Sequence, residues 1–426
     1  MPNLKTLELE YATIADDFYF ALAESASRAK LESIRHESGC GGPSISAAAL
    51  QAYAQSISTM PKLQNLELRN IIIAGDICVS FCGENSQGWL SIEVSTISAA
   101  ASRAFAEIIC TMPNLKTLEL QDATVADDFY IALAESASGA RLESIKHSGR
   151  HDFSAAASEA YAKSICSMPD LKTLELEEVS ITDDFYLTLA GSASGARLES
   201  IKHSGGHDFS AAASEAYAKS ICSMPDLKTL ELEEVSITDD FYLTLAGSAS
   251  GARIQRLVLS GMSTSKSILH SILHLPCLNS LTVRHVKNEL STSHDGNNRE
   301  EAGNESGSVR SPIVHLGVDV KSLSLLKQLN VVSLCPNVVK VSVYIECDQP
   351  TFPSDVDKAW PLYSHNVEIN LQGNVSLVAS DDQFRQSLLA SPTVTRLSVT
   401  DESLGDEKAK ELIRSAGSYP HLKNIS

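Results

Sequence analysis

Histidine and aspartate recur at fixed spacings along this chain, and both residue types bind metal ions and carry acid–base chemistry. His147 and His203 stand 56 residues apart, and His36 has the same place in an earlier segment. Aspartate pairs recur at 16–17, 127–128, 183–184 and 239–240. Zinc ligands must all lie about 2 Å from one ion. Groups that occur once per repeated segment lie in separate copies, so we expect no shared metal site.

The aspartate pairs and histidines have structural explanations instead. The pairs lack the glycine-rich nonapeptide pattern of calcium-binding repeats, and each precedes an apolar helical segment, where carboxylates favour the positive helix N-terminus. The histidines occupy an inward strand position, which predicts buried, hydrogen-bonded side chains. No Ser/His/Asp or Cys/His set has a spacing suited to catalysis. We therefore expect no enzyme, no metal and no cofactor.

The elements that carry these residues are set by a tandem duplication. Residues 141–197 recur as residues 197–253 with one difference, Gly206 in place of Arg150. A fixed period predicts a stack of like units, in which each unit packs against its neighbours. Such stacks present surfaces to partners more often than they enclose active sites.

Each unit begins with a strand motif. LKTLEL, at Leu171, points Leu171, Leu174 and Leu176 inward, and LESIKH repeats the form at Leu198, half a period later. The unit is therefore about 28 residues, and two types alternate. Counting in this register predicts sixteen strands, which start at Leu4, Leu31, Leu63, Trp89, Leu115, Leu142, Leu171, Leu198, Leu227, Ile254, Leu278, Ile313, Val338, Asn366, Val394 and Leu422.

A helix is predicted after each strand. In one type Thr182 or Asp183 is placed to cap it, and in the other Ser154 is. The predicted inward side chains of these helices are Phe185, Leu189, Tyr161 and Ile165. A Met-Pro pair ends the second type of helix, because proline cannot continue it.

This pattern resembles the leucine-rich repeats of the long, ribonuclease-inhibitor type. The resemblance implies an α/β solenoid, a horseshoe with parallel strands on the concave face and helices on the convex face. We expect repeats over 1–286, a disordered polar insertion over 287–312, and the same solenoid continuing over 313–426. The family often has Asn or Cys at the ninth position, where this chain has Ala12, Ala123, Val179 and Val235. Backbone groups or water must therefore satisfy the turn.

The phrases SITDDFYLTLA and ATVADDFYIALA are also similar to repeats of cytosolic NACHT–leucine-rich-repeat receptors of innate immunity. This resemblance implies a non-enzymatic scaffold that senses a ligand. No phosphate-binding GxxxxGK[ST] motif occurs, and the chain begins and ends in mid-repeat, so we expect a fragment of a longer protein. The alternative is an inhibitor or regulator of a soluble enzyme such as a nuclease or small GTPase.

Charge and composition narrow the partners. The net charge of −19 leaves no basic stripe for nucleic acid, and no apolar run is long enough to cross a membrane. The nine cysteines are interpreted as free thiols of a reducing, cytoplasmic compartment. We expect a protein or microbial ligand on the concave face, and oligomers only through missing flanking domains.

The outward strand positions suggest where that ligand binds. In the duplicated region the second and fifth positions alternate in charge, which keeps like charges apart; a charged binding patch is the alternative interpretation. This alternation stops at Ile254. Beyond it, exposed valines at 314, 339 and 367 stand among basic groups with no evident partner. The candidate binding residues are Arg256, Arg284, His315, Lys340, Tyr344 and Arg396.

Overall fold

The structure is a computed structural model of the chain. It describes residues 4–10, 16–26, 30–37, 52, 56, 60, 65–69, 72–73, 88–93, 96–97, 99–111, 115–123, 125–149, 152–205, 208–248, 253–261, 266–285, 313–319, 337–346, 366–372, 394–400 and 424–425. The predicted insertion at 287–312 lies outside these residues. The chain forms two compact units: unit 1 is Met1–Thr229 with Val235–Leu245, and unit 2 is Leu230–Glu234 with Ala246–Ser426.

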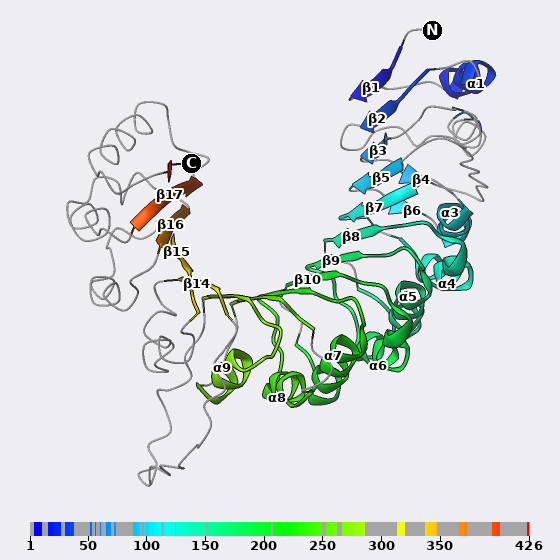
Figure 1. Ribbon diagram of the computed structural model, residues 1–426. Helices are drawn as coiled ribbons and strands as arrows, with labels where there is room; N and C mark the ends of the chain where they lie inside the picture. Colours follow the sequence, from blue (N-terminus) through cyan, green and yellow to red (C-terminus); the bar gives the residue numbers. More distant parts are fainter. Residues whose placement is uncertain are drawn as a thin grey trace, which may run out of the picture. The chain divides into compact units, whose positions relative to one another are not determined.

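Unit 1 is a parallel sheet with a layer of helices beside it (Figure 1). Each strand pairs in parallel with the next strand of the sheet. The strands are β1 (Thr6–Glu10), β2 (Ser33–Glu37), β3 (Asn65–Arg69), β5 (Gly88–Glu93), β7 (Leu115–Gln121), β8 (Ser144–Ser148), β9 (Thr173–Glu177) and β10 (Ser200–Ser204). The helices are α1 (Asp16–Ser25), α3 (Ala99–Thr111), α4 (Asp127–Ser136), α5 (Ala155–Ser167), α6 (Asp183–Ser192) and α7 (Ala211–Ser223). Two short strands missed by the sequence analysis, β4 (Ile72–Ile73) and β6 (Thr96–Ile97), pair separately.

Unit 2 continues the strand–helix pattern. Strand β11 (Thr229–Glu233) and helix α8 (Asp239–Gly247) cross the boundary between the units. The remaining elements are β12 (Arg256–Ser260), α9 (Lys266–Leu273), β13 (Ser280–Arg284), β14 (His315–Asp319), β15 (Lys340–Glu346), β16 (Asn366–Gln372), β17 (Val394–Thr400) and β18 (Asn424–Ile425). From β12 to β18 all neighbours are parallel. The fold is therefore the predicted leucine-rich repeat solenoid.

The core lies between the strands and the helices. The inward leucines of β9 and its lead-in, Leu171 and Leu174, are buried, as are Phe185 and Tyr161 from the helices. The sixth position alternates: His203 is buried and stands in register with Leu176 of the neighbouring strand. These burials confirm the predicted inward set.

Among the described residues, turns between β7 and β13 are closed by backbone hydrogen bonds between repeats. The eighth residue of each repeat there has positive φ and alternates between a residue with a side chain and glycine, as in Glu178 (φ 56°) and Gly205 (φ 122°). The amide of Glu178 donates to the carbonyl of Ser204, at 2.8 Å, and that of Gly149 donates to Glu177, at 3.0 Å. Backbone groups thus replace the family's asparagine, which was one of the two predicted solutions.

The two helix types begin differently. At α5 the Ser154 hydroxyl accepts a hydrogen bond from the Ala157 amide at 3.2 Å, which confirms the predicted cap. At α6 the residue before the helix is Thr182, but its side chain makes no capping bond. The amide of Thr182 instead donates to the buried hydroxyl of Ser158 in α5, at 3.1 Å. The predicted side-chain cap at Thr182 is therefore wrong, because the contact joins two helices.

Substituting the two cap residues should give different results. Ser154→Ala should lower the free energy of unfolding by about 1 kcal/mol, because a helix amide loses its acceptor. Thr182→Ala should lower the free energy of unfolding by less than about 0.5 kcal/mol, the usual range for a surface substitution that removes no helix cap. Urea denaturation followed by circular dichroism compares the two variants. Equal losses would contradict the assignment of the cap to Ser154 alone.

Four predicted strand registers need correction. Asn366 pairs with Lys340, a third-position residue, and Val367 is buried, although the sequence placed it at an exposed second position. Arg396 of β17 pairs with Glu368, and Asn424 of β18 pairs with Arg396, so the predicted starts at Val394 and Leu422 are displaced as well. Trp89, predicted to point inward at a first position, pairs with Asn65 and therefore stands at the third. These errors occur where the leucine pattern is weak.

A candidate partner-binding surface on the strand face of unit 2

The strand face of unit 1 neutralises itself. At the second position Glu143 pairs with Lys116 at 2.7 Å and with Lys172 at 3.6 Å, so one carboxylate joins three neighbouring repeats. A hydrogen bond from Lys116, aided by the charge of Lys172, lowers the pKa of Glu143. At the fifth position Lys146 pairs with Glu119 at 3.3 Å. The predicted alternation of opposite charges is therefore present in the structure.

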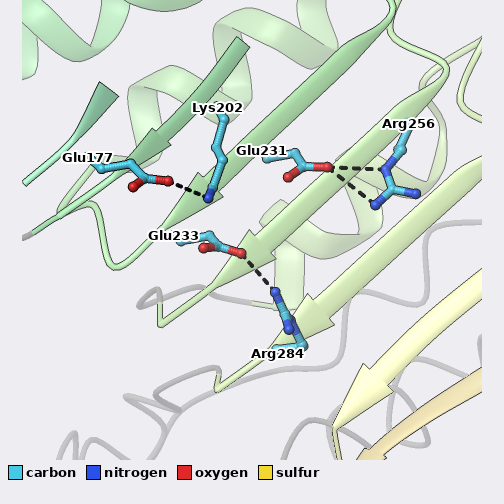
Figure 2. Close-up of polar contacts among 6 residues, drawn as sticks. All are labelled: Glu177, Lys202, Glu231, Glu233, Arg256 and Arg284. Atoms are coloured by element: carbon cyan, nitrogen blue, oxygen red, sulfur yellow. Dashed lines mark hydrogen bonds and ion pairs between the residues drawn. The ribbon is translucent and has the colours of Figure 1, made fainter. Parts of the chain in front are cut away.

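One lysine of this face departs from its predicted column. Lys202 stands in register with Glu175, but its ammonium pairs with Glu177 at 2.6 Å, two residues further along the same strand (Figure 2). The contact is diagonal across neighbouring strands. A long lysine side chain can therefore reach more than one carboxylate on the neighbouring strand. The alternation of charges by strand position does not predict which one it contacts.

In unit 2 two of the three arginines predicted to lack partners pair with glutamates of β11. Arg256 contacts Glu231 at 3.2 Å, and Arg284 contacts Glu233 at 2.8 Å (Figure 2). The Arg284 guanidinium also lies over the ring of Tyr344, with its carbon 5.2 Å from the ring centroid. This cation–π contact places two predicted site residues together.

His315 lies in a hydrogen-bonded row that crosses four strands. Its Nδ1 is 3.4 Å from the hydroxyl of Ser280, and its Nε2 is 2.9 Å from the hydroxyl of Ser342. Ser342 donates in turn to Glu368 at 3.2 Å. Partial burial lowers the pKa of His315, and the charges of nearby Lys340 and Arg256 add to the effect over the opposing Glu368. The hydrogen-bonded row fixes the orientation of the imidazole.

Glu368 brings the last two predicted residues together. Lys340 forms an ion pair with it, and Arg396 contacts it at 3.6 Å. Burial raises the pKa of Glu368, but the hydrogen bonds from Lys340 and Ser342 and the charges of Lys340 and Arg396 outweigh this, so its pKa is lowered. The sequence analysis named both cations but did not name this carboxylate as their shared partner.

Two valines stand exposed beside these groups. Val314 is 42 % exposed and Val339 is 60 % exposed, and the amide of Val339 donates to the carbonyl of Val314 at 2.8 Å. They occupy the second position, where unit 1 carries lysine and glutamate. We call the unit 2 patch the surface formed by Arg256, Arg284, Val314, His315, Val339, Lys340, Tyr344 and Arg396.

Among the residues that the structure describes, no three or more His, Cys, Asp or Glu side chains are grouped as metal ligands. No helix in this part of the chain has the length and apolar character needed to cross a bilayer. Burial raises the pKa of the Cys110 thiol to about 12 and that of Cys166 to about 11. These two thiols stay protonated at neutral pH, which makes them poor nucleophiles.

Comparisons with known proteins find similar solved structures but no sequence match. No protein-family model matches the chain, and no curated protein matches its sequence. Among solved structures the chain is similar to TLR13 in the crystal structure of the TLR13–ssRNA13 complex, with 13 % identity and a TM-score of 0.42. The match covers 97 % of this chain and 55 % of that one, so the chain spans about half the length of that protein. At this score the likeness identifies neither a family nor a ligand.

Proposed function

We propose that this chain is a non-enzymatic recognition scaffold that binds a protein ligand through the unit 2 patch. The resemblance of its repeats to those of NACHT–leucine-rich-repeat receptors supports a more specific role. In that role the chain is the ligand-sensing repeat region of a cytoplasmic innate immune receptor. The coupling to an effector then depends on other parts of the receptor.

The observation that carries the proposal is the exposed valine pair. Val314 and Val339 lie side by side on a sheet face whose equivalent positions in unit 1 are charged. Burying exposed apolar area in a complex is favourable by about 25 cal/mol per Å². The neighbouring arginines and Tyr344 belong to the residue types enriched in binding hot spots. The unit 2 patch thus combines two exposed valines with arginine and tyrosine side chains.

Polar substitution of the valines should abolish capture of the ligand. The full chain and a Val314→Asp/Val339→Asp variant are immobilised and exposed to extract of the source organism, and bound proteins are identified by mass spectrometry. We expect a ligand that the wild-type chain retains and the variant loses, because a charge replaces each apolar contact. A Leu187→Asp variant is the matched control, since Leu187 is exposed on a helix of unit 1.

The outcomes separate the candidate roles. Equal capture by the wild-type chain and the valine variant would contradict recognition through the unit 2 patch. Retention of one soluble enzyme in a tight complex would favour the regulator over the receptor. Loss of the same ligand from the Leu187 variant would place binding on the helix side.

A further inference from the structure

We propose that the ligand of the unit 2 patch is a protein segment in which acidic side chains flank an apolar one. This inference rests on the proposed function and names the chemistry of its partner. Its basis is the arrangement of the ion pairs: in three of the four pairs of the patch, the cation is more exposed than the carboxylate that holds it.

Exposure differs between the partners of these pairs. Glu368 is 12 % exposed, while its partners Lys340 and Arg396 are 40 % and 47 % exposed. Glu231 is 24 % exposed and Arg256 is 52 % exposed. In these three pairs solvent meets mainly the cation, whereas in the fourth pair of the patch Arg284 is 21 % and Glu233 is 28 % exposed.

The second-position pairs of unit 1 lack this asymmetry. Lys172 and Glu143 are 51 % and 40 % exposed, and Lys228 and Glu199 are 52 % and 43 % exposed. Both signs reach solvent there, so an approaching charge meets attraction and repulsion together. The cation-outward arrangement thus distinguishes the patch from that part of the strand face.

The cluster around Glu368 also carries surplus positive charge. Lys340 and Arg396 share its carboxylate, so two cations face one anion among the described side chains. Each cation keeps donors free for a second acceptor, because a guanidinium has five and an ammonium three. Hydrogen bonds to charged groups contribute more than neutral ones. A ligand carboxylate can therefore bind without displacing Glu368.

The valines select the class of ligand. Val339 precedes Lys340 directly, and Val314 precedes His315, so the apolar pair adjoins a cation and an imidazole on two neighbouring strands. A peptide can cover both with one apolar residue beside an acidic one. RNA is a poorer fit, because the valines offer no ring for base stacking and the guanidinium of Arg284 already lies over the ring of Tyr344. Binding of single strands also needs a continuous basic path.

A selection experiment tests this chemistry. Phage-displayed random dodecapeptides are selected on the full-length chain, and the enriched peptides are synthesised with a fluorescent label. Their affinities are measured by anisotropy for the wild type and for K340Q/R396Q, V314S/V339S and K172Q/K228Q. The last variant is the matched control, because it neutralises two equally exposed lysines of unit 1. A labelled 13-nucleotide single-stranded RNA is measured in parallel.

We expect enriched peptides with Asp or Glu beside an apolar residue. Their affinity should fall by about tenfold or more in K340Q/R396Q, since one lost charged hydrogen bond accounts for about a tenfold change. It should fall by a similar factor in V314S/V339S, and by less than about twofold in K172Q/K228Q. Higher salt should weaken binding to the wild type.

Other results overturn the inference in distinguishable ways. Enrichment of basic or neutral peptides that still depend on the valines refutes the acidic partner and leaves the recognition surface standing. Tighter binding of the RNA than of any peptide identifies a nucleic-acid ligand instead. Peptides that bind all variants equally, or no enrichment at all, refute both the inference and the proposed function.

Discussion

Replacing Gly205 with alanine should destabilise the chain by about 2 kcal/mol or more, because both the backbone angle and the space exclude a Cβ. Its φ is +122°, a conformation that L side chains rarely adopt. A Cβ there would also lie 2.8 Å from the Cα and 2.9 Å from the amide nitrogen of Glu178. Because both contacts are with backbone, no rotamer change relieves them. The denaturation midpoint in urea, followed by circular dichroism, measures the loss.

Gly191→Ala provides the control for this prediction. Gly191 lies in helix α6, and a Cβ on it would meet nothing within 4 Å. Alanine should therefore raise the free energy of unfolding by about 0.5–1 kcal/mol, through its higher helix propensity. The two glycine-to-alanine changes thus have opposite expected signs. A stable Gly205→Ala chain with an unchanged midpoint would show that the turn relaxes around the new side chain.

The stability of the N-terminal repeats should decline as the pH falls from about 6.5 to about 4. Burial lowers the pKa of His36 from its ordinary 6.5 to about 4. In this interval the unfolded state binds a proton that the folded state excludes, so lowering the pH favours unfolding. A difference of this size corresponds to about 3 kcal/mol, reached near pH 4 and absent above about pH 7.

The variant His36→Leu tests this directly. Leucine stands in register on both sides of His36, as Leu9 in β1 and Leu68 in β3, so the position accepts it. The difference in unfolding free energy between variant and wild type should grow as the pH falls through this interval. Tyr19→Phe, which removes a hydroxyl 3.4 Å from the ring, is the control and should keep the wild-type slope, because burial and not that contact shifts the pKa. A pH-independent difference for His36→Leu would be the contrary result.

The repeat pattern predicted the fold because leucines recur at inward strand positions in every repeat of the duplicated region. There, Leu171 and Leu174 mark the inward positions, and burial confirms them. The charge columns followed from the same register, since neighbouring strands lie about 4.8 Å apart. Where the leucines give way to valines and asparagines, as at Asn366 and Val367, the sequence pattern did not fix the register, and the predicted start of β16 was two residues off.

The partners of the candidate site were harder to foresee. Arg284 reaches Glu233 two strands away, across β12, where the residue in register is the small Ser260. Glu368 forms ion pairs with both Lys340 and Arg396. Pairings of this kind depend on side-chain length and on small neighbours, which a column-by-column comparison of adjacent strands does not include. The six candidate residues are nevertheless exposed or half-buried side chains of one unit.

The alternating turns also explain the length of the tandem copy. A Cβ on Gly149 would collide with Asp122, one on Gly205 with Glu178, and one on Gly261 with the Glu234 side chain. From β7 to β12 each side-chain-bearing turn is thus followed by a glycine turn. Insertion of a single 28-residue repeat there would place two turns of one kind together, whereas a block of two keeps the order. The 56-residue pair is therefore the smallest segment that this region can gain or lose without bringing two like turns together.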